Sequence, residues 1–136
     1  MARRSRLSGN VGQVGMDLEL TVNGVSVTAP ERACTVAGEL APDALAESRS
    51  IVAQLPAVRA RAADRLLALY NETWLTDEIG VLDKAAFMSR LSNPSIVLSE
   101  VPGSATIYFD DGDVFGGHYV VVTWEHGGPS DVNLAG

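Results

Sequence analysis

The sequence predicts one small α+β domain: an N-terminal β-hairpin, two to three helices and a C-terminal antiparallel meander, packed as a two-layer sandwich. An Asn-Gly pair lies between two strand-like runs near the N-terminus, helical periodicity follows over residues 42–91, and β-branched and aromatic residues dominate the remainder. Strands and helices are therefore segregated along the chain instead of alternating, which argues against a parallel α/β fold.

The N-terminal hairpin is expected to have strands at about residues 16–22 and 25–29. Apolar residues alternate with polar or acidic ones in the first run, so the apolar residues share one face of a strand. Asn23-Gly24 follows directly, and both residues accept the positive φ angles of a type I′ turn. This dipeptide between two alternating runs is a strong hairpin signal.

The helical region is expected to begin with two helices. Pro42 and Asp43 suit the first turn of a helix, Pro56 interrupts it, and a second helix runs to about Trp74. The residues expected in the core share a helical period and are Leu45, Ile51, Val52, Leu55, Val58, Ala62, Leu66, Leu69 and Tyr70. The opposite face of the second helix carries charged residues that we expect in solvent, namely Arg59, Arg61, Asp64 and Arg65.

A third, short helix is expected at about residues 83–91. Asp83 is the predicted N-cap, and Asn93-Pro94 is the predicted end signal. Its buried residues are expected to be Phe87, Met88 and Leu91.

Three or four further strands are expected. Three of them lie at residues 95–98, 105–109 and 119–124, which are rich in Val, Ile, Tyr, Phe and Thr and are separated by glycine-containing turns. The segment from Tyr119 to Val122 is apolar on both faces. We therefore expect a central strand that helices cover on at least one side.

Basic residues concentrate at the N-terminus. Three of the ten Lys and Arg residues are Arg3, Arg4 and Arg6, which stand outside any strand or helix pattern. We therefore interpret residues 1–15 as a flexible basic tail and residues 16–136 as the folded domain.

The rest of the chain is acidic. The net charge is −7, and from Asn71 onward only Lys84 and Arg90 oppose ten carboxylates. Such a field repels nucleic acid and anionic membranes and attracts a basic protein. We expect a basic protein partner and no nucleic-acid or membrane partner, with a monomer and a homodimer both left open.

Composition also narrows the class of protein. Cys34 is the one cysteine, so no intrachain disulfide is possible, and no apolar run is long enough to span a membrane. No apolar signal segment follows the basic start, so a cytoplasmic location is expected. No glycine-rich phosphate loop opens a helix, and no cofactor is predicted.

The acid–histidine cluster of the chain consists of Asp110, Asp111, Asp113 and His118. We favour a structural interpretation, in which Asp111-Gly112 forms a turn and Asp110 and Asp113 flank it with side-chain-to-backbone hydrogen bonds. Gly116-Gly117 would then be a bulge where strand pairing resumes. The alternative is a site for a hard divalent cation, or an acid–base pair.

A polar–aromatic segment, residues 70–74, ends the second helix. We favour a structural interpretation here too, in which Trp74 seals the core edge while Asn71 and Thr73 bond to free backbone groups. The alternative is a binding surface, since Tyr70 and Trp74 are residue types favoured as interface anchors.

Two segments resemble a known bacterial family. Residues 69–74 read Leu-Tyr-Asn-Glu-Thr-Trp, and residues 108–118 read Tyr-Phe-Asp-Asp-Gly-Asp-Val-Phe-Gly-Gly-His. Together with the Ala-Gly ending, they resemble the family of domain of unknown function 2262, in which Trp usually stands where this chain has Gly116. The resemblance implies a small bacterial cytosolic protein without an assigned activity, and an immunity or protein-binding role.

The leading hypothesis is a non-enzymatic protein-interaction or immunity-type protein with an acidic binding surface. Its candidate binding residues are Tyr70, Asn71, Trp74, Asp110, Asp111, Asp113, Phe115 and His118. The alternative is a metal-dependent hydrolase or small-ligand enzyme centred on residues 110–118. A third possibility is a structural subunit that dimerises through an exposed edge strand.

Overall fold

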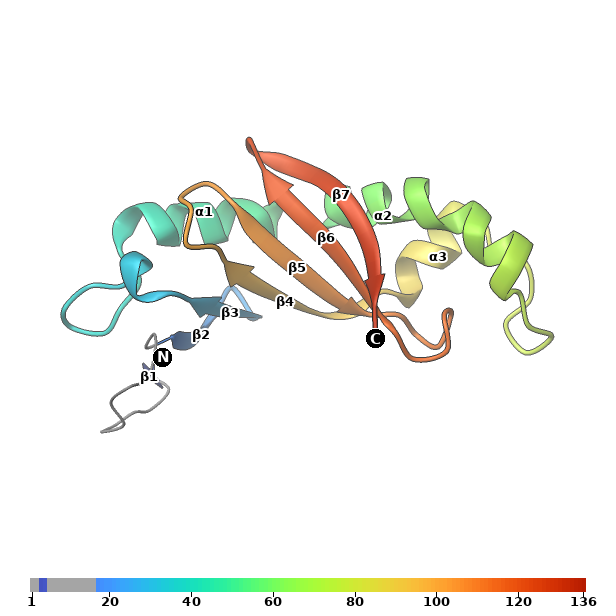
Figure 1. Cartoon of the computed structure of the whole chain (residues 1–136), viewed down its shortest axis with the longest axis horizontal. Helices are drawn as coiled ribbons and strands as arrows, with labels where there is room; N and C mark the ends of the chain where they lie inside the picture. The colour runs from blue at the N-terminus through green and yellow to red at the C-terminus, as the bar shows by residue number, and fades with distance from the viewer. Residues whose placement is uncertain (1–2, 5–16) are drawn as a thin grey trace.

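One sheet runs through the described part of the chain, and the helices lie on one of its faces (Figure 1). The computed structural model describes residues 3–4 and 17–136. Its strands are β1 (Arg3–Arg4), β2 (Leu18–Val22), β3 (Val25–Ala29), β4 (Ser92–Leu98), β5 (Ala105–Asp110), β6 (Tyr119–Glu125) and β7 (Gly128–Ala135). They neighbour one another in chain order, and all pairs are antiparallel except β3 and β4, which are parallel.

The connection between β3 and β4 contains the described helices. They are the 3-10 turn η1 (Glu31–Ala33), α1 (Pro42–Ala53), α2 (Leu55–Leu69), the π-turn η2 (Tyr70–Trp74) and α3 (Lys84–Arg90). In Figure 1, α1 and α2 lie behind the sheet, so none of the described helices covers the face toward the viewer, which we call the uncovered face. Burial along β5 alternates accordingly, with Phe109 buried and its neighbours Tyr108 and Asp110 half-buried. The predicted α+β class is confirmed.

Local sequence signals placed most elements correctly. Asn23 and Gly24 have φ angles of 49° and 84°, so both adopt the positive φ that the predicted hairpin turn requires. A break separates α1 from α2 next to Pro56, as expected. At the start of α3, Asp83 Oδ1 accepts a hydrogen bond from the Ala86 amide at 2.8 Å, which confirms the predicted N-cap.

The buried faces of the helices differ in detail from the prediction. On α1 the fully buried residues are Ala44, Ser48 and Ile51, while Leu45 and Val52 are only half-buried. On α2 the core row follows an i+4 spacing through Val58, Ala62, Leu66 and Tyr70. This row continues to Tyr70, so Leu69 lies beside the row instead of within it. Leu69 is 38% exposed, and the prediction that it is buried was wrong.

Two arginines predicted in solvent are half-buried instead. Arg59 Nε donates to the Leu91 carbonyl at 3.1 Å, and its guanidinium lies over the Phe109 ring, 5.1 Å from the centroid. Arg61 Nε donates to the Ser130 carbonyl at 3.2 Å. Their long stems let them cross the edge of the helix and tie α2 to α3 and β7.

The prediction that Asn93-Pro94 ends α3 was wrong, because the helix ends at Arg90 and the pair lies inside β4. The register joins Ser92 to Asp110 and Ser95 to Tyr108, so Asn93 and Pro94 together face one residue of β5. This is a β-bulge, and Asn93 adopts the positive φ of 49° that Asn tolerates.

Strand β6 is internal but not central. It lies between β5 and the edge strand β7, and helices cover one of its faces. On the uncovered face, Tyr119 is 50% exposed. The apolar run therefore predicted helical cover on one side correctly, but not a central position.

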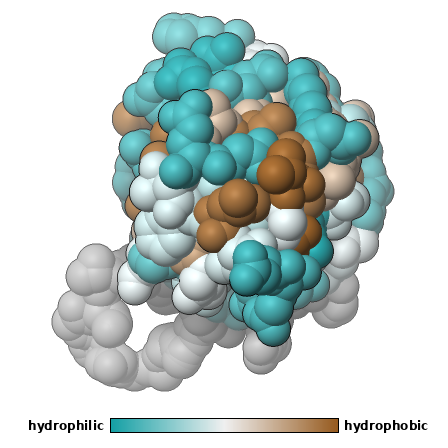
Figure 2. All heavy atoms as spheres, turned by 90° about the vertical axis from the view of Figure 1, so that its right-hand side faces the viewer, coloured by the Kyte–Doolittle hydropathy of each residue, from teal (hydrophilic) through white to brown (hydrophobic). Residues whose placement is uncertain are grey.

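The predicted basic tail, residues 1–15, lies outside the described residues except for Arg3–Arg4, which form β1 beside β2. Within the described ranges, none of the helices has the length and apolar character that crossing a membrane requires. Seen from the end that carries α3, the molecule exposes apolar atoms among polar ones (Figure 2). Exposed apolar residues after the π-turn include Leu75 and Val81.

Candidate binding site at the aspartate loop

Residues 111–118, which join β5 to β6, form a loop organised by one buried carboxylate; we call it the aspartate loop. Asp111 is 3% exposed. Its carboxylate accepts four backbone N–H bonds, from Asp113 at 2.8 Å, Phe115 at 3.0 Å, Gly117 at 3.1 Å and His118 at 2.9 Å. The Asp111 side chain thus accepts hydrogen bonds from loop amides that have no neighbouring strand to bond to.

The roles of the three aspartates differ from the prediction. Asp110 and Asp113 were expected to bond to the backbone of the turn, but Asp111 does so. The loop is too long for a two-residue turn, and an interior acceptor is needed to satisfy amides that point inward. Asp113 is exposed with a φ of 65°, and Asp110 accepts instead from the Asn93 side chain.

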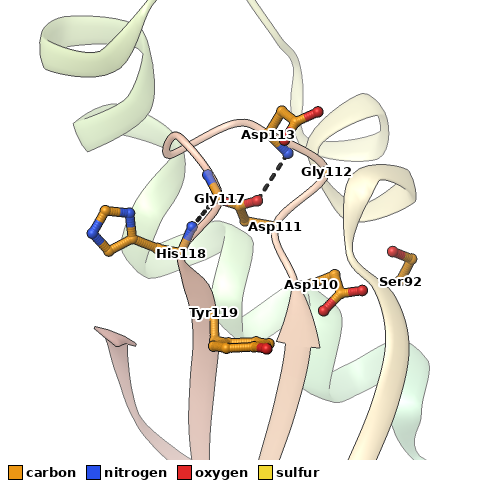
Figure 3. A pocket seen from close by; sticks show the side chains of 8 residues that line it. All are labelled: Ser92, Asp110, Asp111, Gly112, Asp113, Gly117, His118 and Tyr119. Carbon is orange, nitrogen blue, oxygen red and sulfur yellow. Dashed lines mark hydrogen bonds between the residues drawn. The ribbon is translucent and has the colours of Figure 1, made fainter. Parts of the chain in front are cut away.

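The structure does not gather the residues of the alternative interpretation, a metal site, into one group. Figure 3 shows the side chains of Asp110, Asp113 and His118 pointing in different directions from the loop. Within residues 3–4 and 17–136, no three His, Cys, Asp or Glu side chains are grouped so that they fit a metal ion. The carboxylate of Asp111 is already engaged by its four amides.

The π-turn η2 holds the segment that follows it. The Tyr70 hydroxyl donates to the Gly80 carbonyl at 2.8 Å. Asn71 bonds to the backbone of Leu82 in both directions, at 3.0 and 3.1 Å. Tyr70 is completely buried, so it holds the segment after the π-turn from the core side. The expected role of Asn71 as a backbone partner agrees with these bonds, although the backbone is that of the next segment.

The π-turn also packs against the aspartate loop. The Trp74 ring meets the rings of Phe115 and His118 edge-on, at centroid distances of 5.6 and 5.7 Å. The His118 Nδ1 atom lies 2.6 Å from the Phe115 carbonyl. Phe115 is completely buried, and these contacts fix the path of the chain into β6. The two segments singled out in the sequence are therefore neighbours in space.

Asp110 lies at the end of β5, where the β4 bulge turns a partner toward it. Asn93 Nδ2 donates to Asp110 Oδ2 at 2.7 Å. No other hydrogen bond or ion pair reaches this carboxylate from the part of the chain that the structure describes. Asp110 is thus held through its Oδ2 atom, and its Oδ1 atom accepts no hydrogen bond from the described residues.

Two adjoining hollows lie on either side of Asp110 and Tyr119. The first, which we call the tyrosine hollow, has a volume of about 420 Å³ and is lined by Asn93, Ser95, Tyr108, Phe109, Asp110 and Tyr119. The second, the loop hollow, has a volume of about 310 Å³ and is lined by Ser92, Asp110, Asp111, Gly112, Asp113, Gly117, His118 and Tyr119 (Figure 3). Together they form an open concave surface at one end of the sheet.

The two tyrosines come from neighbouring strands. In the β5–β6 register, Tyr108 faces Val121 and Asp110 faces Tyr119, so Tyr108 and Tyr119 are diagonal neighbours on the uncovered face. Side chains at this spacing contact one another or a shared ligand. The rings therefore border the hollow beside the Asp110 carboxylate.

The charge around the hollows is unbalanced. Among the residues that the structure describes, no Lys or Arg lines either hollow. Of the two cations after Asn71, Lys84 pairs with Asp64 at 2.8 Å, and Arg90 donates to the Gly112 carbonyl at 3.3 Å. Lys84 is therefore paired away from the hollows, whereas the Gly112 carbonyl that Arg90 contacts belongs to the lining of the loop hollow. Within the described residues, no Lys or Arg forms an ion pair with Asp110.

Sequence reasoning missed Asn93, Tyr108 and Tyr119 as site residues. Tyr108 lies near the end of β5 and Tyr119 at the start of β6, so the two tyrosines flank the aspartate loop in the sequence. This placement could have indicated that they belong to the site. The role of Asn93 was not readable, because it depends on a bulge that only the pairing of β4 with β5 reveals.

No curated protein and no solved structure matches the chain. A bacterial family described as "Uncharacterized protein conserved in bacteria (DUF2262)" matches residues 26–133, which include the π-turn and the aspartate loop. The chain therefore belongs to the DUF2262 family.

Proposed function

We propose that this protein is a non-enzymatic binding domain that recognises a basic protein through the two hollows around Asp110 and Tyr119. The observation that carries the proposal is the composition of this surface: tyrosine rings and carboxylates line it, and none of its described lining residues is a Lys or Arg. Tyrosine is enriched at the centres of protein interfaces, and an unopposed carboxylate selects a cationic partner.

The overall charge supports a basic partner. The chain carries a net charge of −7, and its described cations near the site are engaged in internal bonds. Opposite charges accelerate encounter over distances of about a Debye length, roughly 8 Å at physiological salt. An acidic domain that neutralises a basic toxin, as immunity proteins do, is one function that this surface suits, and we expect it to act in the cytoplasm.

The geometry of the aspartate loop favours binding over catalysis. Asp111 is used to build the loop, and the His118 ring is turned toward Phe115 and Trp74. A pair of residues that act as general acid and general base must converge on one substrate position. Asp110, Asp113 and His118 point apart instead.

The proposal is tested by affinity capture from the native bacterial cell with four immobilised proteins: the wild type, Asp110→Asn, Tyr119→Ala and Glu100→Gln. Glu100 is exposed in the turn between β4 and β5, at the other end of β5, so Glu100→Gln removes the same charge away from the site. We expect a basic protein that the wild type and Glu100→Gln retain and the two site variants lose.

Identification by mass spectrometry and a titration with the purified partner complete the test. A partner that binds all four proteins equally would place the interface elsewhere and contradict the proposal. An acidic partner would contradict the charge argument.

A further inference from the structure

We propose that the tyrosine hollow is a receptor for an arginine side chain of the partner. This inference rests on the proposed function and deepens it, because it names the chemical group that enters the site. It is carried by three features of the hollow: a fixed carboxylate, two aromatic walls and neutral acceptors beside them.

The fixed carboxylate is Asp110. Asn93 Nδ2 donates to its Oδ2 atom at 2.7 Å and so restricts its rotation. Its Oδ1 atom remains available to a ligand, since no other described group bonds to this side chain. A carboxylate oriented before binding loses less conformational entropy when a cation arrives, which strengthens a charge-assisted hydrogen bond.

The aromatic walls are Tyr108 and Tyr119. Their diagonal placement puts one ring on each strand beside Asp110, and Tyr119 is half exposed. A guanidinium within about 6 Å of a ring centroid gains a cation–π attraction. Strand β5, which contributes Tyr108, already has such a contact on its covered face, where the Arg59 guanidinium lies 5.1 Å from the Phe109 ring centroid.

The neutral acceptors favour arginine over lysine. Because Asn93 Nδ2 is bonded to Asp110, the Oδ1 atom of Asn93 is left as an acceptor, and Ser95 adds a hydroxyl to the same wall. A guanidinium has five donors in one plane and stacks flat on a ring, so it can use the carboxylate, the amide and the ring together. An ammonium group is more strongly hydrated and cannot stack.

The first test uses ¹⁵N-labelled full-length protein titrated with N-acetyl-arginine amide. The reporter is the Asn93 side-chain amide, because its Nδ2 atom donates to the Asp110 carboxylate and both residues line the tyrosine hollow. N-acetyl-lysine amide and the uncharged isostere N-acetyl-citrulline amide serve as matched probes. We expect a saturable shift of the Asn93 amide with arginine in the millimolar range, at least about threefold weaker binding with lysine, and no saturation with citrulline.

Variants locate the site. Asp110→Asn keeps the acceptor for Asn93 but removes the charge, and we expect it to weaken the arginine probe about tenfold. Tyr119→Phe is expected to retain binding within about twofold, while Tyr119→Ala loses it, because the ring face supplies the contact. Glu100→Gln is the control for charge alone and should bind like the wild type.

Equal binding of arginine and citrulline, or shifts confined to residues outside the hollow, would overturn the arginine receptor. So would self-association that disappears in Asp110→Asn, since a second copy would then occupy the hollow. If the probe fails while partner capture still depends on Asp110 and Tyr119, the proposed function stands and this inference alone is wrong. If both fail, the proposed function is wrong as well.

Discussion

At the scale of single residues, adjacent aspartates have opposite roles. Asp111 is buried and receives four amides, whereas Asp110 is held by one side-chain amide and faces an open hollow. Strand geometry explains the difference, because neighbouring positions at a strand end point to opposite sides of the sheet. One carboxylate therefore builds the loop, and the other is available to a ligand.

The first prediction concerns the buried aspartate. Asp111→Ala removes the acceptor of four backbone donors, so we expect the free energy of unfolding to fall by about 3 kcal/mol or more. Asp113→Asn is the control, since Asp113 is exposed and Asn tolerates its positive φ; a change within about 0.5 kcal/mol is expected. Urea denaturation followed by circular dichroism measures both. Similar losses in the two variants would refute the organising role of Asp111.

A second prediction concerns Glu47 on α1. Burial raises its pKa above the usual range, and the Arg32 guanidinium and the Gly103 backbone only partly oppose this; its Oε2 atom is buried without a hydrogen bond from the described residues. Because the folded state holds this proton more tightly, the contribution of Glu47 to stability is fully present below its unfolded pKa and is lost as the pH rises through its folded value.

The test compares melting temperatures of the wild type and Glu47→Gln from pH 4 to pH 7. We expect the variant to gain on the wild type as the pH rises, because it has no charge to bury. Glu39→Gln, at an exposed position, is the control and should follow the wild type. A wild type that gains on Glu47→Gln with rising pH would reverse the sign and disprove the argument.

At the scale of elements, the aspartate loop is fitted closely to the end of α3. Gly112 has a φ of 60°, and a Cβ atom there would lie 2.6 Å from the Arg90 carbonyl oxygen. Gly117 has a φ of 90°, but nothing lies within 4 Å of its Cβ position. Substitutions at the two glycines therefore distinguish the cost of a positive φ angle, which both share, from the cost of a steric clash, which arises only at Gly112.

The third prediction uses this pair. We expect Gly117→Ala to cost about 1 kcal/mol of stability from its positive φ alone, and Gly112→Ala to cost about 2–4 kcal/mol, because the loop must also move away from α3. Chemical denaturation gives both values. Equal costs would mean that the loop moves away from the Arg90 carbonyl oxygen without a further loss of stability.

Elements were predictable where the signal is local. The Asn23-Gly24 turn, the break at Pro56 and the Asp83 cap all follow from backbone preferences of a few residues. The bulge at Asn93-Pro94 was not predictable, because the same dipeptide ends helices elsewhere and only pairing with β5 reveals its role. The tyrosine hollow depends on that bulge, so it was also missed.

At the scale of the whole molecule, one parallel strand pair makes the two halves of the chain into one sheet. The parallel pairing of β3 with β4 joins the N-terminal hairpin to the C-terminal meander, across a connection that contains the described helices. Alternation along each strand predicted which face is buried, but it carries no information about which strands pair over such a distance. The α+β class was therefore predictable, and the parallel pair was not.

The fourth prediction concerns the charge of the whole protein. With the partner identified by capture, we expect the association rate constant to fall about tenfold between 20 and 300 mM salt, because screening weakens the attraction between an acidic domain and a basic protein. Stopped-flow or surface plasmon resonance measures it. A rate independent of salt would exclude electrostatic steering.

The most direct test of the account is the dissociation constant of the partner complex, measured at one ionic strength for Asp110→Asn and Glu100→Gln beside the wild type. Both variants lose one negative charge, but only Asp110 borders the tyrosine hollow. We expect affinity at least about tenfold weaker for Asp110→Asn and within about twofold of the wild type for Glu100→Gln. Equal effects of the two substitutions would mean that Asp110 is not part of the binding site.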